Sequence, residues 1–530
     1  MEERDMLLRL ILAIVLSVMV LVTFEHLFLR QKAQRPPEGP EKVQRAQQEI
    51  QPLKERKAPF PLEGYSDIVV ETPLYRAVFT TYGGRLKSIT LKGYRDKVEL
   101  HPLGRWVQGL IARIFGKRLD TSPPKPVELV STSQLERLPL GLVLSGIDYD
   151  ESVPWVASST NLRVSGKPEE LRMVWGKGDV VLQRVYRFFP ESYQIEVSVE
   201  ANREVFLGLG WIGRTDLKKS YYGFYGPIFL GPQGRTKLKP KKIKKGEIRH
   251  FEQIRWFAFD QDYFASIIAP KSPGRLMLGR LDKKTVYGFI TSDGPSRSHY
   301  FRLFLGPKDP DKLEQFLPTA EKVIDYGTFG IIAIPILKIM RFTHGFTGNW
   351  GFDIILLALF IKLVFFWPTQ KSYEAMKEMQ KLAPEIKMLQ KKYKDDKQRL
   401  QKELMELYRR RKVNPFSGCL PLLLQLPVFF ALYRALLVSI DLRHAPFILW
   451  IRDLSGKDPT YISPLLMGAT MFLQQKLTPS QGDPQQQKMM LFLPLIFTVL
   501  FLNFPSGLVI YWLASNVFGI LHQLYLSRRR

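Results

Sequence analysis

Residues Asn349 to Pro368 read NWGFDIILLALFIKLVFFWP, a nearly unbroken apolar run that carries one lysine, Lys362, well inside it. The run is long enough to cross the hydrocarbon core of a bilayer as a helix. A core helix of a soluble protein could hold leucine in place of this lysine, whereas a bilayer makes a cation within a span costly. The stretch therefore predicts a membrane helix and makes Lys362 a candidate functional residue.

Four more apolar segments crowd into the last third of the chain, and with the first they predict a five-helix membrane core over residues 349–530. A sixth apolar segment, Leu7 to Phe24, has no A-x-A cleavage site after it and predicts an uncleaved transmembrane anchor over residues 1–29. The four later segments run from Ser417 to Ile440, Tyr461 to Leu477, Met489 to Phe504 and Gly507 to Leu526.

Between the anchor and the core, apolar and polar residues alternate, as in VVETPLYRAVFTTYGGRLKSITLKGY (69–94). This period-two pattern predicts a large all-β domain, a sandwich of many strands, over residues 63–316. Residues 30–62 are rich in Gln, Pro, Glu and Lys and predict a flexible linker. Residues 317–348 predict a linker followed by an amphipathic helix that lies in the membrane interface.

The charge distribution predicts the orientation. Residues 371–412 carry fourteen Lys or Arg against seven Asp or Glu, so the positive-inside rule places this loop in the cytoplasm. Both termini are then cytoplasmic and the β domain lies outside. The whole chain has a net charge of +27. Since long apolar spans are present, this excess favours anionic lipids as partners, and no specific nucleic acid is expected.

The cytoplasmic loop is predicted to be a helical hairpin kinked near Pro384, with a turn and N-cap at Asp395 and Asp396. Its apolar residues recur at intervals of three and four, at Met376, Met379, Leu382, Ile386, Leu389 and Tyr393, and again at Leu400, Leu404 and Leu407. The hairpin is either a solvated arm or a docking arm for a cytoplasmic partner. The candidate docking residues are Lys377, Lys387, Lys391, Arg409 and Arg410.

No enzyme signature appears. GLGWIG (208–213) matches a dinucleotide-binding spacing, but no helix pattern follows it. The seven histidines lack ligand spacing, and the single cysteine, Cys419, excludes an intrachain disulfide or a Cys-rich metal site. We therefore expect no catalysis, metal or cofactor. The basic run RTKLKPKKIKKGEIRH (235–250) is either a lipid or nucleic-acid patch or a solvated loop or hairpin, and the latter is favoured.

Several motifs resemble the YidC/Oxa/Alb family of membrane protein insertases. They are NWGF (349–352), VNPFSGCLPLLLQLPVFFALY (413–433), LRHAPFILWIRDLSGKDP (442–459), DPQQQKMM (483–490) and FPSGLVIYWLASN (504–516). YGGRLKSITLKGY (82–94) and WFAFDQDYFASIIAP (256–270) resemble the periplasmic domain of the Gram-negative form. The resemblance implies a multi-pass protein of the bacterial inner membrane, with a periplasmic β-supersandwich. It also implies a hydrophilic groove, open to the cytoplasm and to lipid.

In this family Lys362 falls where an arginine is typical, and its charge would attract acidic or polar tails of substrates. From its depth alone, Lys362 could instead snorkel to headgroups. Ala358 stands where some relatives carry threonine. Arg434 is a departure from the family pattern and is expected to snorkel outward. Further groove candidates are polar or aromatic residues that could equally serve helix packing, namely Gln425, Thr498, Tyr511, Trp512 and Asn516.

The resemblance implies an insertase and chaperone that inserts, folds and helps assemble nascent membrane proteins, alone or with the Sec translocon. The ribosome and the signal recognition particle receptor are further expected partners. One alternative is a transporter or channel with Lys362 at a substrate site, although no internal repeat of the kind common in transporters is found. Another is a periplasmic binding module, for which a single anchoring helix would suffice.

Overall fold

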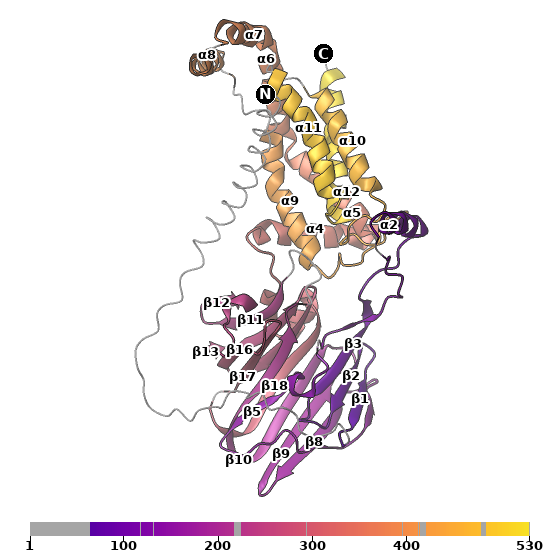
Figure 1. Cartoon of the computed structure of the whole chain (residues 1–530), viewed down its shortest axis with the longest axis vertical. Helices are drawn as coiled ribbons and strands as arrows, with labels where there is room; N and C mark the ends of the chain where they lie inside the picture. The colour runs from indigo at the N-terminus through magenta and orange to yellow at the C-terminus, as the bar shows by residue number, and fades with distance from the viewer. Residues whose placement is uncertain are drawn as a thin grey trace.

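The computed structural model describes residues 64–116, 118–130, 132–216, 224–292, 294–394, 396–411, 413, 420–478 and 484–528. The predicted anchor and linker at residues 1–62 lie outside these described residues, as do Cys419 and Asp395. The described chain forms a β domain and a helical bundle joined end to end (Figure 1).

The β domain contains two sheets within the described residues, one of five strands in the order β4-β3-β2-β1-β7 and one of thirteen strands. The first nine strands are β1 (Asp67–Glu71), β2 (Tyr75–Thr80), β3 (Leu86–Arg95), β4 (Pro126–Glu128), β5 (Leu142–Ser145), β6 (Val156–Ala157), β7 (Asn161–Arg163), β8 (Glu169–Lys177) and β9 (Val180–Phe188). The others are β10 (Gln194–Arg214), β11 (Tyr225–Gly231), β12 (Gly234–Lys237), β13 (Ile248–Ile254), β14 (Trp256–Gln261), β15 (Phe264–Pro270), β16 (Gly274–Arg280), β17 (Thr285–Thr291) and β18 (Ser296–Pro307).

The alternation in the sequence sets which strand faces form the core. In β9, Leu182, Tyr186 and Phe188 are fully buried and alternate with more exposed residues. The GLGWIG segment lies within β10 and opens no helix. Its Gly210 lets the Phe289 ring pack against the strand, because a Cβ there would lie 2.4 Å from the ring. The motif therefore serves sheet packing.

The helices are α2 (Pro102–Ile114), α3 (Pro310–Phe316), α4 (Gly330–Thr347), α5 (Trp350–Val364), α6 (Phe366–Lys381), α7 (Ala383–Lys392), α8 (Lys397–Arg410), α9 (Leu420–Val438), α10 (Ile462–Leu477), α11 (Pro484–Phe501) and α12 (Ser506–Arg528). Short 3-10 turns are η1 (Leu135–Arg137), η2 (Pro240–Lys242) and η3 (Ala320–Val323). The β-rich domain and the helical C-terminal region confirm the coarse fold prediction. The all-β prediction for residues 63–316 was wrong at α2 and α3.

Helix α5 begins at the NWGF motif because Asn349 caps it. The Asn349 side-chain oxygen accepts a hydrogen bond from the Gly351 amide at 2.9 Å, and its amide donates to the Phe447 carbonyl at 3.2 Å. Gly351 allows this approach, since a Cβ there would lie 2.0 Å from the Phe447 side chain.

The apolar run that opens the bundle is not one straight helix. Helices α5 and α6 meet at Phe365 with a bend of 62°. Pro368 explains the break, because its ring would clash with the carbonyl of Val364, four residues earlier, in a continuous helix. Lys362 therefore lies in the last turn of α5, which ends at Val364, before the end of the apolar run from Asn349 to Pro368 that predicted a membrane helix.

By length and composition, one helix among the described residues, Ser506–Leu526 within α12, is apolar enough to cross a membrane. The bent pair of α5 and α6 forms a second such stretch if it counts as one span. Proline interrupts two of the other predicted spans, at Pro427 in α9 and Pro494 in α11.

Candidate functional site: a polar face inside the helical bundle

Lys362 is half-buried, while the next two residues, Leu363 and Val364, are exposed at 63% and 54%. Lys362 makes no hydrogen bond or ion pair with any residue that the structure describes. It acts electrostatically on His522 of α12. The His522 ring packs against Phe366 at 4.5 Å between centroids. Lys362 is thus a cation that has no counter-ion among the described residues and lies close to α12.

Gln425 of α9 also turns toward α12. Its side-chain nitrogen donates to the Ser515 hydroxyl at 2.6 Å. The Tyr511 hydroxyl, one turn away, is fully buried near Gln425 but lacks hydrogen-bond geometry with any described residue. Because hydrocarbon cannot satisfy such groups, the three side chains create a polar spot between two apolar helices.

Tyr511, Ser515 and His522 lie on one face of α12, since they are separated by four and seven residues. Together with Lys362 of α5 and Gln425 of α9 they form what we call the polar face. Sequence reasoning missed Ser515 and His522. Their helical spacing from Tyr511 was the available signal, but only the tertiary contacts reveal that they face Gln425 and Lys362.

The other predicted groove residues make helix-packing contacts. The Asn516 amide donates to the Met467 carbonyl and the Thr470 hydroxyl of α10, both at 3.3 Å. The Thr498 hydroxyl donates to the Pro494 carbonyl of its own helix at 2.7 Å. Trp512 packs into an aromatic cluster with Phe429, Phe497 and Phe501, at centroid distances of 5.2, 5.6 and 5.4 Å.

Residues 371–412, predicted to form the hairpin, include the later part of α6 and helices α7 and α8, which lie at the end of the bundle opposite the β domain (Figure 1). The helix breaks at Leu382, two residues before Pro384, and Asp396 caps α8 by accepting from the Arg399 amide at 2.9 Å. The candidate docking residues Lys387, Lys391, Arg409 and Arg410 are exposed and Lys377 is half-buried. A concavity of about 250 Å³ between α7 and α8 is lined by Glu385, Met388, Leu389, Lys392, Glu403, Leu407 and Arg410.

A charged junction links the β domain to the bundle at Asp325. Arg235 and Lys237 of β12 pair with its carboxylate at 2.7 and 3.0 Å, and Arg434 of α9 donates to its backbone carbonyl at 2.5 Å. Burial acts to raise the pKa of Asp325, but the two β12 cations outweigh it and hold that pKa well below its ordinary value. Arg434 thus reaches outward, and part of the basic run 235–250 serves this junction.

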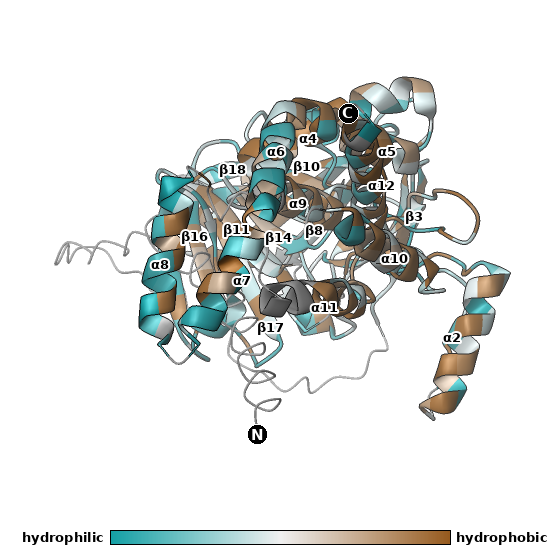
Figure 2. Ribbon diagram, turned by 90° about the horizontal axis from the view of Figure 1, so that it is seen from above, coloured by the Kyte–Doolittle hydropathy of each residue, from teal (hydrophilic) through white to brown (hydrophobic). Residues whose placement is uncertain are grey.

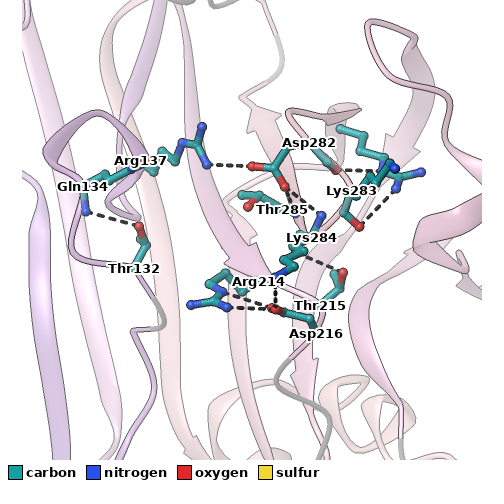
Figure 3. Close-up of polar contacts among 11 residues, drawn as sticks. Thr132, Gln134, Arg137, Arg214, Thr215, Asp216, Asp282, Lys283, Lys284 and Thr285 are labelled. Atoms are coloured by element: carbon teal, nitrogen blue, oxygen red, sulfur yellow. Dashed lines mark hydrogen bonds and ion pairs between the residues drawn. The ribbon is translucent and has the colours of Figure 1, made fainter. Parts of the chain in front are cut away.

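A second ion-pair cluster lies where β10 ends and β17 begins (Figure 3). Arg137 donates to Asp282 at 2.7 Å, and Arg214 holds Asp216 through two bonds of 3.0 and 2.8 Å. Lys284 lies 3.5 Å from the same Asp216 carboxylate. Both carboxylates are already paired, so the cluster ties the end of β10 to the start of β17.

Two family models match adjacent parts of the chain. The model described as "60Kd inner membrane protein" covers residues 342–530, and the model "YidC periplasmic domain" covers residues 115–339. The chain is 38% identical over 502 residues to membrane protein insertase YidC of Syntrophus aciditrophicus, covering 90% of this chain and 88% of the relative. It is 36% identical over 550 residues to membrane protein insertase YidC of Geobacter metallireducens, covering 98% of each.

Among solved structures, an active YidC insertase with its first transmembrane domain resolved matches 88% of this chain and 93% of its own length. The sequence identity is 20% and the TM-score is 0.39.

Proposed function

The chain belongs to the YidC family of membrane protein insertases, which are not enzymes, and we propose that its polar face is where it receives substrates. An insertase with a periplasmic domain is a protein of the inner membrane. The substrates are nascent membrane proteins. The observation that carries the proposal is Lys362, a half-buried cation with no counter-ion among the described residues. It acts electrostatically on His522 of α12, two turns along that helix from the hydrogen bond between Gln425 and Ser515.

In the proposed mechanism, an incoming segment places its polar flank against the polar face while its apolar helix moves into lipid. Transfer of the apolar helix out of water supplies the free energy. The polar side chains lower the cost of carrying the flank through hydrocarbon, where unpaired polar groups are expensive. A point charge such as Lys362 attracts an acidic flank without holding it in a fixed geometry.

The proposed topology places the β domain in the periplasm and the hairpin in the cytoplasm, with both termini cytoplasmic. Its support is the distribution of Lys and Arg in the sequence and the position of α7 and α8 at the far end of the bundle (Figure 1). In this topology the exposed cations of the hairpin are the docking site for a cytoplasmic partner, such as the ribosome or the signal recognition particle receptor. The Sec translocon is a further proposed partner for larger substrates, and anionic lipids balance the basic surface.

Purified full-length protein in vesicles tests this function. We expect it to insert a small membrane protein with an acidic translocated tail, scored by protection of that tail from protease, without any nucleotide. Vesicles without the protein are the control. A channel or transporter would instead pass small solutes, so a leakage assay on the same vesicles should stay at the level of empty vesicles. Solute flux without tail protection would favour the channel or transporter reading.

A further inference from the structure

Helix α2 presents an apolar face that no described part of the chain covers. Trp106, Leu110, Ile114 and the following Phe115 are exposed at 67%, 46%, 69% and 71%. The first three are spaced by four residues, so they lie on one side of the helix. Three large apolar side chains on one exposed helix face, with a fourth at the end of the helix, are unusual on a soluble surface and indicate a binding surface.

The opposite side of α2 is docked at the outer end of the bundle. Gln108 donates to the Pro459 carbonyl at 2.7 Å, and a Cβ at Gly104 would lie 2.9 Å from the Pro459 ring. Pro459 lies three residues before α10, whose fourth and fifth residues, Leu465 and Leu466, are exposed at 58% and 50%. The apolar face of α2 is therefore near the level at which the apolar surface of the bundle begins.

The orientation of α2 also fits a membrane surface. In Figure 1 it lies at the end of the bundle nearest the β domain, and in Figure 2, seen along the length of the bundle, it projects outward at full length. Helix α2 thus runs across the bundle axis. Its 13 residues give a length of about 20 Å, enough for three turns in contact with a bilayer.

Two arginines flank the apolar face. A shallow concavity of about 360 Å³ on α2 is lined by Pro102, Arg105, Trp106, Gly109, Leu110 and Arg113. Arg105 and Arg113 are exposed and belong to no ion pair among the described residues. A tryptophan between cations is typical of helices at the headgroup level, where the indole is half in hydrocarbon and arginines meet phosphates.

We propose that α2 lies in the headgroup layer of the outer leaflet and binds anionic phospholipid, giving the β domain a membrane contact of its own. The inference rests on family membership, which places the bundle in the inner membrane. Helix α2 precedes the residues matched by the periplasmic family model, which begin at residue 115. Its role would be to hold the β domain at a fixed tilt above the bilayer.

Site-specific quenching tests this contact in the full chain. In a Cys419→Ser background, Leu110→Cys is labelled with an environment-sensitive fluorophore and reconstituted into vesicles of phosphatidylethanolamine and phosphatidylglycerol that contain spin-labelled lipid. We expect the label at 110 to be quenched by shallow spin labels. Leu465→Cys at the first turn of α10 is the positive control, and Val174→Cys, 41% exposed on β8 of the β domain, is the negative control.

Arg105→Gln with Arg113→Gln should reduce quenching at position 110 at least twofold in phosphatidylglycerol vesicles and leave it unchanged in phosphatidylcholine vesicles. Absence of quenching at 110 alongside quenching at 465 would overturn the proposal. Energy transfer between labelled copies without lipid quenching would also overturn the proposal, because it would show that the apolar face of α2 contacts a second copy of the chain instead of lipid. Insertion activity, measured in parallel, should stay at the level of the Cys419→Ser parent, so failure of this contact is distinguishable from failure of the insertase.

Discussion

At the scale of single residues, the proposed polar face carries Lys362 at a position where the family resemblance implies arginine. Lysine keeps the charge but lacks the planar fork that binds a carboxylate through two hydrogen bonds. The sequence alone located Lys362 and Gln425, because a charge or an amide within an apolar run stands out. The sequence could not assign a role to Trp512, since an indole suits a groove, an interface or a core equally well. The contacts of Trp512 with Phe429, Phe497 and Phe501 show that it packs between helices.

A buried ion pair in the β domain gives a residue-scale prediction. Lys308 and Asp260, each 2% exposed, are 2.9 Å apart. Burial raises the pKa of Asp260 although Lys308 opposes it. Lys308→Met leaves a buried carboxylate without a partner and should lower the free energy of unfolding by about 3–5 kcal/mol. Denaturant titration of the detergent-solubilised full chain measures this change.

The double variant Lys308→Met with Asp260→Leu should recover most of that loss, because both buried charges are removed together. Lys312→Met, at a partly exposed pair with Asp309, is the matched control and should cost less than about 1 kcal/mol. A single Lys308→Met variant as stable as this control would show that the pair is not buried in solution.

At the scale of elements, the long helices followed from apolar runs and the strands from alternation. Helix α2 has a helical spacing of apolar residues, at Leu103, Trp106, Leu110 and Ile114, that can be read from the sequence. It was overlooked because the segments on both sides have the alternation of strands. The bend at Phe365 was missed because the run stays apolar up to Pro368. Hydropathy does not report the backbone restriction that this proline imposes.

The junction at Asp325 gives an element-scale prediction. Asp325→Asn removes the carboxylate that Arg235 and Lys237 share and should loosen the β domain relative to α9. Spin labels on β18 and α10 should then show a broader distance distribution at pH 7. Glu321→Gln, a nearby acid outside this junction, is the control variant and should leave the distribution unchanged.

The pH dependence of the same contact has a definite sign. The pKa of Asp325 is lower in the folded state than in the unfolded chain. The stabilisation that its ion pairs give to the junction is therefore fully present above the ordinary carboxyl pKa, about 3.9. It is lost only as the pH falls through the lower pKa of the folded state. The wild-type distance distribution should therefore be the same at pH 7 and pH 5. Broadening between these values would contradict the assigned pairing.

At the scale of the whole molecule, the β domain and the bundle share a hydrophobic core, since Leu437, Val438 and Ile440 at the end of α9 are buried with residues of the β domain. The Tyr263 hydroxyl adds a hydrogen bond of 2.9 Å to the Leu436 carbonyl. The sequence predicted both parts but not this shared surface, because contacts between distant segments leave no local pattern.

Deletion of residues 63–316 gives the whole-molecule prediction. The remaining core should still insert a small substrate, since the polar face lies entirely within α5, α9 and α12. It should also melt at a lower temperature in detergent, because the deletion exposes Leu437, Val438 and Ile440. Complete loss of insertion by a core that remains folded would favour a periplasmic binding module instead.

The most direct test of the account compares insertion of a small protein with an acidic translocated tail by four forms of the full chain in vesicles. They are the wild type, Lys362→Arg, Lys362→Leu, and the swapped variant Lys362→Leu with Leu363→Lys, which keeps the composition but moves the charge to the exposed side of α5. We predict that the arginine form inserts like wild type, whereas the leucine and swapped forms lose on the order of tenfold, equivalent to about 1.4 kcal/mol. Equal insertion by all four forms would contradict the claim that Lys362 is the charge that receives substrates.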